Sequence, residues 1–198
     1  MTIEQLKKLK ELAGKAKYER TREFADMFLF SSFTGLRVSD LVSLKWSEVD
    51  MDKGMISHMQ YKGHTRNAKM LYIPLNETSR EILERWKDKH EEFVFGLLPS
   101  GYDLSDEAAF KKMKGAKTRT INQSLRSIGD KMGLPFNLHI HLGRHTFSMM
   151  ALNGGVDIKT TSSMLGHAST LVTEKVYATL LPNTIAEIVG DKLNVKLD

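Results

Sequence analysis

Two histidines flank an arginine in the heptapeptide "HLGRHTF", residues 141–147. His141 and His145 are four positions apart, the helical spacing of two imidazoles in zinc proteases, but Leu142 stands where such a helix carries its glutamate. Arg144 would repel a divalent cation, and a guanidinium between imidazoles is instead a good receptor for phosphate. We therefore favour an anion site over a metal site. For His145 we favour a structural role, as a buried helix residue bonded to a backbone carbonyl.

Two further stretches carry residues suited to the same anion. "FTGLRVSDLVSLKW", residues 33–46, places Arg37 after a glycine turn and at the start of a helix, where backbone N–H groups also attract anions. "MLGHAST", residues 164–170, puts His167 directly after a glycine, and Tyr177 follows a few positions later. Each residue alone also has an ordinary structural explanation: Arg37 as a surface cation, His167 as a helix cap and Tyr177 at the edge of an apolar face.

The elements that must position these residues are mostly helices. Three helices are expected to begin at a capping box: at Thr2 with Gln5, at Thr78 with Glu81, and at Thr120 with Gln123, the last one ending at Gly133. Apolar periodicity predicts three more: around Phe24–Leu29 up to Gly35, from Ser39 to Trp46, and from about 142 to Asn153. Short helices are expected at 157–164 and 173–180, and Pro182 can open a last one. Residues 54–60 and 69–75 read as strands of a β-hairpin. We expect a mainly α fold with a small antiparallel β-sheet (α+β).

Composition is that of an ordinary globular protein with a basic surface. The 198 residues are 41% hydrophobic and 27% charged, with 29 Lys and Arg against 24 Asp and Glu. Basic residues gather in two clusters: Lys111, Lys112, Lys114, Lys117 and Arg119, and Lys62, His64, Arg66 and Lys69. The absence of cysteine excludes disulfides and thiolate metal sites, and no apolar run approaches the ~18 residues that span a bilayer. Either cluster alone would be read as a solvated surface, but both of them beside the motifs above favour phosphate contacts.

In this order the motifs resemble the catalytic domain of the tyrosine recombinase (phage-type integrase) family. The family's first arginine motif is matched by Thr34, Gly35, Leu36, Arg37, Ser39, Leu41, Leu44 and Trp46, with Asp40 where the family often has glutamate. The H-x-x-R-H motif is matched by His141, Arg144 and His145, with Gly143 where the family usually has leucine, and the L-G-H motif by Leu165, Gly166 and His167. Tyr177 falls at the nucleophile, and Lys62 in "YKG", ahead of "IPL", at the hairpin lysine, with Lys69 as its rival.

The resemblance implies a role for each matched residue. Arg37 and Arg144 hold the phosphate, and Tyr177 attacks it to form a 3′-phosphotyrosyl intermediate. Lys62, or its rival Lys69, protonates the 5′ leaving oxygen, His141 acts in acid–base exchange and His167 donates to the phosphate. No metal or cofactor is expected. A phosphate-facing Arg144 would contribute little to the core.

The expected function is that of a site-specific DNA recombinase or integrase catalytic domain that serves a phage or mobile element. Its partners would be double-stranded DNA and further copies of itself, in a synaptic tetramer on DNA, with no membrane, in a prokaryotic cytoplasm at the nucleoid. The alternatives are a type IB topoisomerase-like enzyme and a non-catalytic DNA-binding module of the same fold. Nothing in the chain resembles the N-terminal core-binding domain of the family, so residues 1–198 are expected to form one catalytic domain.

Overall fold

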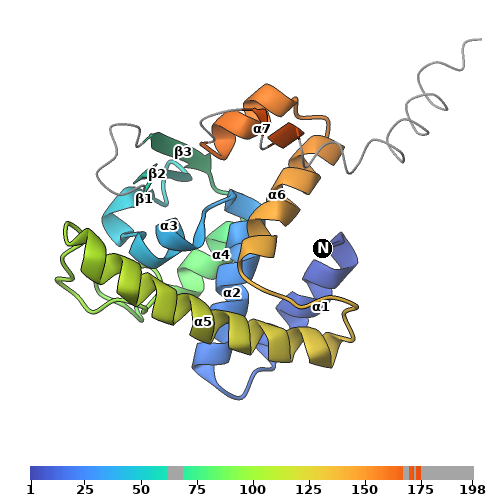
Figure 1. The fold of residues 1–198 in the computed structure, drawn as a ribbon, viewed down its shortest axis with the longest axis horizontal. Helices are drawn as coiled ribbons and strands as arrows, with labels where there is room; N and C mark the ends of the chain where they lie inside the picture. Colours follow the sequence, from blue (N-terminus) through green and yellow to red (C-terminus); the bar gives the residue numbers. More distant parts are fainter. Residues whose placement is uncertain (62–68, 167–169, 172, 175–198) are drawn as a thin grey trace, which may run out of the picture. The chain divides into compact units, whose positions relative to one another are not determined.

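The computed structural model describes residues 1–61, 69–166, 170–171 and 173–174 (Figure 1). The chain forms two compact units, Met1–Phe147 and Ser148–Asp198. The first unit contains most of the helices and the sheet. The expectation of a single catalytic domain over 1–198 stays a prediction.

The first unit is built around helix α2 (Glu19–Thr34), which packs against α1 (Ile3–Gly14), α4 (Glu77–Trp86) and α5 (Glu107–Met132) (Figure 1). The chain from Glu23 to Ser32 is buried on every side, since neighbouring helices surround it. Phe24, Met27, Phe28 and Leu29 place apolar side chains on several sides of this helix, so it needs such a buried position. The helices expected from Thr2 and up to Gly35 are confirmed.

A small antiparallel sheet lies beside these helices, with strand order β1 (Val49–Asp50), β2 (Met55–Met59), β3 (Met70–Pro74). On β2 the side chains of Ile56 and His58 are buried, and those between and after them are exposed. This alternation follows from the two-residue period of a strand. The expected hairpin and the mainly α fold with a small antiparallel sheet are both confirmed. Strand β1 was not expected, because two residues are too short to show a pattern.

Three element boundaries differ from expectation. Helix α3 (Val38–Ser43) ends before Trp46, because the carbonyl of Leu44 turns to accept a hydrogen bond from Val94 N–H (2.9 Å). Trp46 begins a short 3₁₀ helix, η1 (Trp46–Glu48). The cap of α4 is Asn76, whose side chain accepts from Ser79 N–H, and Thr78 is already inside the helix.

Helix α5 begins much earlier than the expected start at Thr120. Asp106 caps it by accepting from Ala109 N–H (2.9 Å), and the helix continues to Met132 before Gly133. Its first half buries Phe110 but is otherwise lysine-rich, so the apolar period is visible only from Ile121 onwards. This is the physical reason why the start was missed.

Helix α6 (His141–Asn153) follows, as expected, and its first half belongs to the first unit. In the second unit α7 (Ile158–Met164) is capped by Asp157 and confirms the helix expected at 157–164. The helix expected at 173–180 lies outside the described residues from 175 onwards, and so does the one expected from Pro182.

Gly143 lets α6 approach α2 closely. A Cβ atom at this position would lie 2.9 Å from the carbonyl oxygen of Phe28 and 2.9 Å from Cβ of Ser31. Contacts this short with a helix backbone cannot be relieved by rotating a side chain. Glycine at position 143 is therefore a requirement of the α2–α6 contact.

We predict that Gly143→Ala destabilises the protein by about 1–3 kcal/mol, because α6 must move away from α2. The matched control is Gly115→Ala within α5, where a Cβ atom meets nothing within 4 Å. That change should be neutral or stabilise by up to about 1 kcal/mol, through helix propensity. Urea unfolding measures both free energies. Equal stability of the two variants would contradict the close α2–α6 contact.

Candidate anion site at the junction of α2, α3 and α6

The turn between α2 and α3 is made by Gly35. Its φ of 71° lies in the left-handed region that glycine adopts without strain, and its N–H donates to Ser31 C=O. Leu36 is fully buried, and its carbonyl accepts a hydrogen bond from Ser31 Oγ (2.9 Å). The turn therefore fixes the next residue, Arg37, as the cap position at the N-terminus of α3.

Arg144 joins α6 to this turn. Its side chain is buried, and Nη1 donates to the Gly35 carbonyl at 2.6 Å. Burial and the charge of Arg37 lower the pKa of Arg144 to about 9, so the guanidinium keeps its charge at neutral pH. The expectation that Arg144 contributes little to the core is wrong, because its loss would leave the buried Gly35 carbonyl without this partner.

The guanidinium of Arg37 is the second cation at this junction. Its Nη1 atom is buried and has no hydrogen-bond partner among the described residues. The charge of Arg37 also lowers the pKa of Arg144 and of His141, so the three side chains lie within electrostatic reach of one another. Two neighbouring cations with a buried unpaired donor are unfavourable unless an anion neutralises them. The arrangement is therefore that of an anion receptor.

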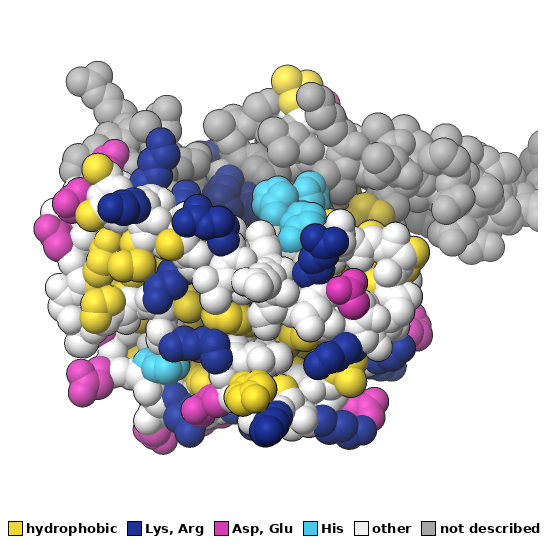
Figure 2. Space-filling model, turned by 60° about the horizontal axis from the view of Figure 1, so that its bottom comes forward, with side chains coloured by type: hydrophobic (Ala, Val, Ile, Leu, Met, Phe, Trp, Pro, Cys, Tyr) yellow, Lys and Arg dark blue, Asp and Glu magenta, His cyan; other side chains and the backbone are white. Residues whose placement is uncertain are grey.

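His141 and His145 lie one turn apart on α6, with their rings edge to face at 4.7 Å. Partial burial lowers the pKa of both imidazoles, and the charge of Arg144 lowers them further, so both are neutral at pH 7. A neutral imidazole can accept a proton or donate one. The expected burial of His145 is wrong, since solvent reaches its side chain. Figure 2 shows a cluster of histidine side chains on a face that also carries Lys and Arg. Within the described ranges no cluster of three or more His, Asp and Glu could hold a metal ion.

Asp40 connects the Arg37 turn to the hairpin. Its carboxylate is fully buried; Oδ2 accepts from Arg37 N–H (3.2 Å) and Oδ1 from Tyr61 N–H (2.9 Å). Tyr61 directly precedes Lys62 in the sequence. From the sequence, Asp40 was noted only because it stands where the family often has glutamate. His58 was missed; it is a residue of β2 and lies beside Asp40. A histidine on the apolar side of an alternating strand was the available signal.

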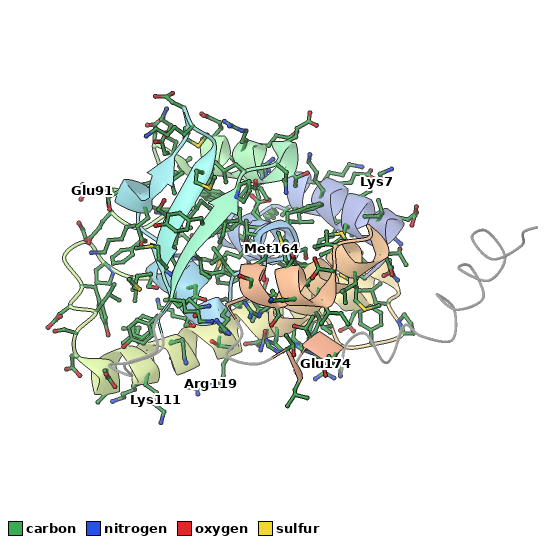
Figure 3. All side chains as sticks on the ribbon, turned by 90° about the horizontal axis from the view of Figure 1, so that it is seen from above. Lys7, Glu91, Lys111, Arg119, Met164 and Glu174 are labelled. Carbon is green, nitrogen blue, oxygen red and sulfur yellow. The ribbon has the colours of Figure 1, made fainter. Side chains whose placement is uncertain are left out.

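The first basic cluster lies along α5. Lys111, Lys112 and Arg119 are exposed there, and Lys114 and Lys117 are half-buried. In Figure 3 the side chains of Lys111 and Arg119 point away from the helices of this unit. Because α5 packs against α3, the basic helix is a neighbour of the element that begins at Arg37. Of the second cluster only Lys69 is described, and it is exposed.

The structure thus brings together Arg37, His141 and Arg144. Three other predicted site residues, Lys62, His167 and Tyr177, lie outside the described residues. Their roles stay predictions.

A family model described as the phage integrase family matches residues 1–183. The chain belongs to the phage integrase family. Tyrosine recombinase XerC of Bacillus pumilus is 31% identical over 146 residues, which cover 73% of this chain and 45% of that protein. The chain spans about half the length of the curated relatives it matches.

Solved structures share the fold. The crystal structure of XerA recombinase has a TM-score of 0.69 at 22% identity, over 99% of this chain and 64% of that chain. The Tn1549 transposon integrase in complex with transposon right end DNA has a TM-score of 0.68 at 20% identity, over 95% of this chain and 64% of that chain. Across the described residues, no helix has both the length and the apolar character to cross a membrane.

We predict that sulfate raises the melting temperature of the protein, because an anion that binds only the folded state stabilises it. Arg37→Gln should reduce this rise while leaving the melting temperature without sulfate equal or higher, since it removes a cation next to Arg144. Arg126→Gln, at an exposed position on α5, is the control and should retain the full rise. Differential scanning calorimetry over a sulfate series checks this. The same rise in Arg37→Gln as in the control would argue against the anion site.

Proposed function

We propose that the chain is the catalytic domain of a site-specific DNA recombinase that cleaves and rejoins DNA through a 3′-phosphotyrosyl intermediate. The observation that carries the proposal is the buried Nη1 of Arg37, which has no hydrogen-bond partner among the described residues, near the buried Arg144. A phosphodiester is the anion of a DNA-cleaving enzyme, and the family relatives named tyrosine recombinases support it as the substrate. The structure of the Tn1549 transposon integrase in complex with DNA, which has a similar fold, also supports DNA as the substrate.

The arginines supply electrostatic stabilisation. When a phosphodiester is attacked, negative charge builds on its non-bridging oxygens, and fixed cations lower the barrier most when they need not reorganise. Arg144 is held in advance by the Gly35 carbonyl, so its remaining N–H groups have a fixed direction. Arg37, whose Nη1 has no partner among the described residues, would complete the contact with the phosphate.

Bond making and breaking fall to residues matched by the family resemblance. Tyr177 Oη attacks phosphorus, a phosphotyrosyl bond forms and the bond to the 5′ oxygen breaks. Lys62 gives that oxygen its proton, with Lys69 as the alternative donor. His141, neutral at pH 7, takes part in proton exchange, and His167 donates to the phosphate. Rejoining is the reverse reaction: the 5′ hydroxyl of the other strand attacks phosphorus, the phosphotyrosyl bond breaks and Tyr177 Oη takes up a proton. This scheme uses no metal or cofactor.

DNA would lie along the basic face of α5 and cover the arginines. We further propose that copies of the protein assemble on DNA as a synaptic tetramer, at the nucleoid of a prokaryotic cell and in the service of a phage or mobile element. The bacterial relative supports the prokaryotic host, and the transposon integrase supports the mobile element. The type IB topoisomerase-like alternative would not require paired sites, and a non-catalytic module would bind DNA without forming a covalent adduct.

The nucleophile is tested with a nicked suicide substrate, on which cleavage traps the covalent complex. Tyr177→Phe should abolish the adduct without loss of DNA affinity, because only an oxygen is removed. Arg37→Ala should keep the fold and slow cleavage by ~10²-fold or more, the usual effect of losing one fixed charge donor. Gel mobility after denaturation measures the adduct. An adduct on Tyr177→Phe would show that another residue is the nucleophile.

The general acid is tested with a substrate whose 5′ leaving oxygen is replaced by sulfur, which leaves without a proton. This substrate should restore cleavage by Lys62→Ala but not by Arg37→Ala. Lys69→Ala is the matched control, and rescue of that variant instead would reassign the acid. EDTA should leave all cleavage rates unchanged. Loss of cleavage in EDTA that is restored by adding Mg²⁺ would contradict metal-free chemistry.

DNA binding should weaken steeply with salt, because each neutralised phosphate releases counterions with a slope contribution of about −0.9 in log K against log salt. Lys111→Gln and Arg119→Gln should each reduce the slope by about one. Lys7→Gln is the control, since this exposed lysine lies on α1 and, in Figure 3, apart from Lys111 and Arg119. Fluorescence anisotropy over a salt series gives the slopes. Equal slopes for all three variants would exclude α5 as the DNA-binding face.

A further inference from the structure

A buried histidine lies behind the Arg37 turn. His58 is 2% exposed and sits on the apolar side of β2, in register with Leu71 of β3. Its Nδ1 is 2.9 Å from Glu48 Oε1, and its Nε2 is 3.6 Å from Asp40 Oδ1. The imidazole thus stands between two carboxylates, one from η1 and one from α3.

These carboxylates decide the charge of His58. Burial alone would lower its pKa, but Asp40 and Glu48 outweigh burial and raise the pKa to about 9. The facing elements supply Asp40 from α3 and Glu48 from η1, while β3 places Leu71 opposite. His58 is therefore an imidazolium at neutral pH. Its stabilising effect is full below the unfolded pKa of 6.5 and is lost as pH rises through about 9.

Asp40 transmits this interaction to the proposed site. One oxygen of its carboxylate accepts from the backbone of Arg37 and the other from the backbone of Tyr61. The Tyr61 ring also packs on Phe110 of α5, with ring centroids 4.0 Å apart. The direction of one buried carboxylate therefore determines both where α3 begins and where the hairpin leaves β2. A buried carboxylate keeps a fixed direction only when its charge is compensated.

We propose that His58 is a positioning residue: through its ion pair with the Asp40 carboxylate, it sets the spacing between the backbone of Arg37 and that of Tyr61. The consequence for DNA cleavage rests on the proposed function. His58 does not touch the phosphate in this scheme. It acts through Asp40 on the backbone of Arg37, the residue proposed to bind the phosphate.

The structural part is tested without DNA. In the protein, the ¹⁵N–¹H signals of the Arg37 and Tyr61 amides should follow one titration centred near pH 9, because both amides donate to Asp40. His58→Gln should abolish this titration. His90→Gln is the matched control: Nε2 of His90 lies 3.3 Å from Glu23 Oε1, so it is also a histidine beside a buried carboxylate, and it should leave the titration intact. Amides that do not titrate together in the wild-type protein would overturn the proposal without any substitution.

The functional part compares covalent complex formation at pH 7.5, chosen below the pKa of about 9. His58→Gln should be slowed on the order of 10- to 100-fold at unchanged DNA affinity, the usual result of displacing a reacting group by a fraction of an ångström to an ångström. His90→Gln should react at the wild-type rate even if it lowers the melting temperature as much as His58→Gln does. Equal rates for the two variants would refute the role of His58. A wild-type protein with coupled amide titrations but no covalent complex would instead refute the proposed function, and leave the structural role of His58 standing.

Discussion

The hydrogen bond from Arg144 to the Gly35 carbonyl holds the candidate site together. It links residues 109 positions apart, and it is buried, so neither partner can exchange it for water without opening the α2–α6 contact. Three local features make it possible: the left-handed backbone of Gly35, the missing side chain of Gly143 and the burial of Leu36. Arg37 follows directly after this turn, so the bond that fixes one arginine also determines the position of the other.

Among the residues that the structure describes, the charges at this junction suit the binding of a further anion. Arg37 and Arg144 repel each other, and the nearest buried carboxylate, Asp40, is engaged by backbone N–H groups and by His58. The histidines on α6 are neutral because partial burial lowers their pKa values and the charge of Arg144 lowers them further. A bound phosphodiester would relieve the repulsion, and a developing negative charge would relieve it further. The repulsion between the two arginines thus lowers the stability of the fold at the place where the proposed function needs both cations.

Much of the fold and part of the candidate site could be predicted from local sequence, and the features that were missed have physical causes. The glycine turn before Arg37 and the helix from His141 are local features, and both were found. The burial of Arg144 could not be predicted, because its partner is distant in sequence and the side chain type favours the surface. The start of α5 was missed because Lys111–Arg119 offers little apolar period, and the ion cluster around His58 depends on three separate elements. Lys62, His167 and Tyr177 lie outside the described residues, so their places rest on motif matches alone.

The central claim is that Arg37 and Arg144 act on the negative charge of a scissile phosphate. Its most direct test is cleavage of a suicide substrate in which a methylphosphonate replaces that phosphate, so that the reacting group is neutral. Relative to the wild-type protein, Arg37→Ala should be slowed ~10²-fold or more on the phosphodiester, and the methylphosphonate should remove most of this defect, since there is less charge to stabilise. A defect of the same size on both substrates would contradict the account, because the arginine would then act through structure and not through charge.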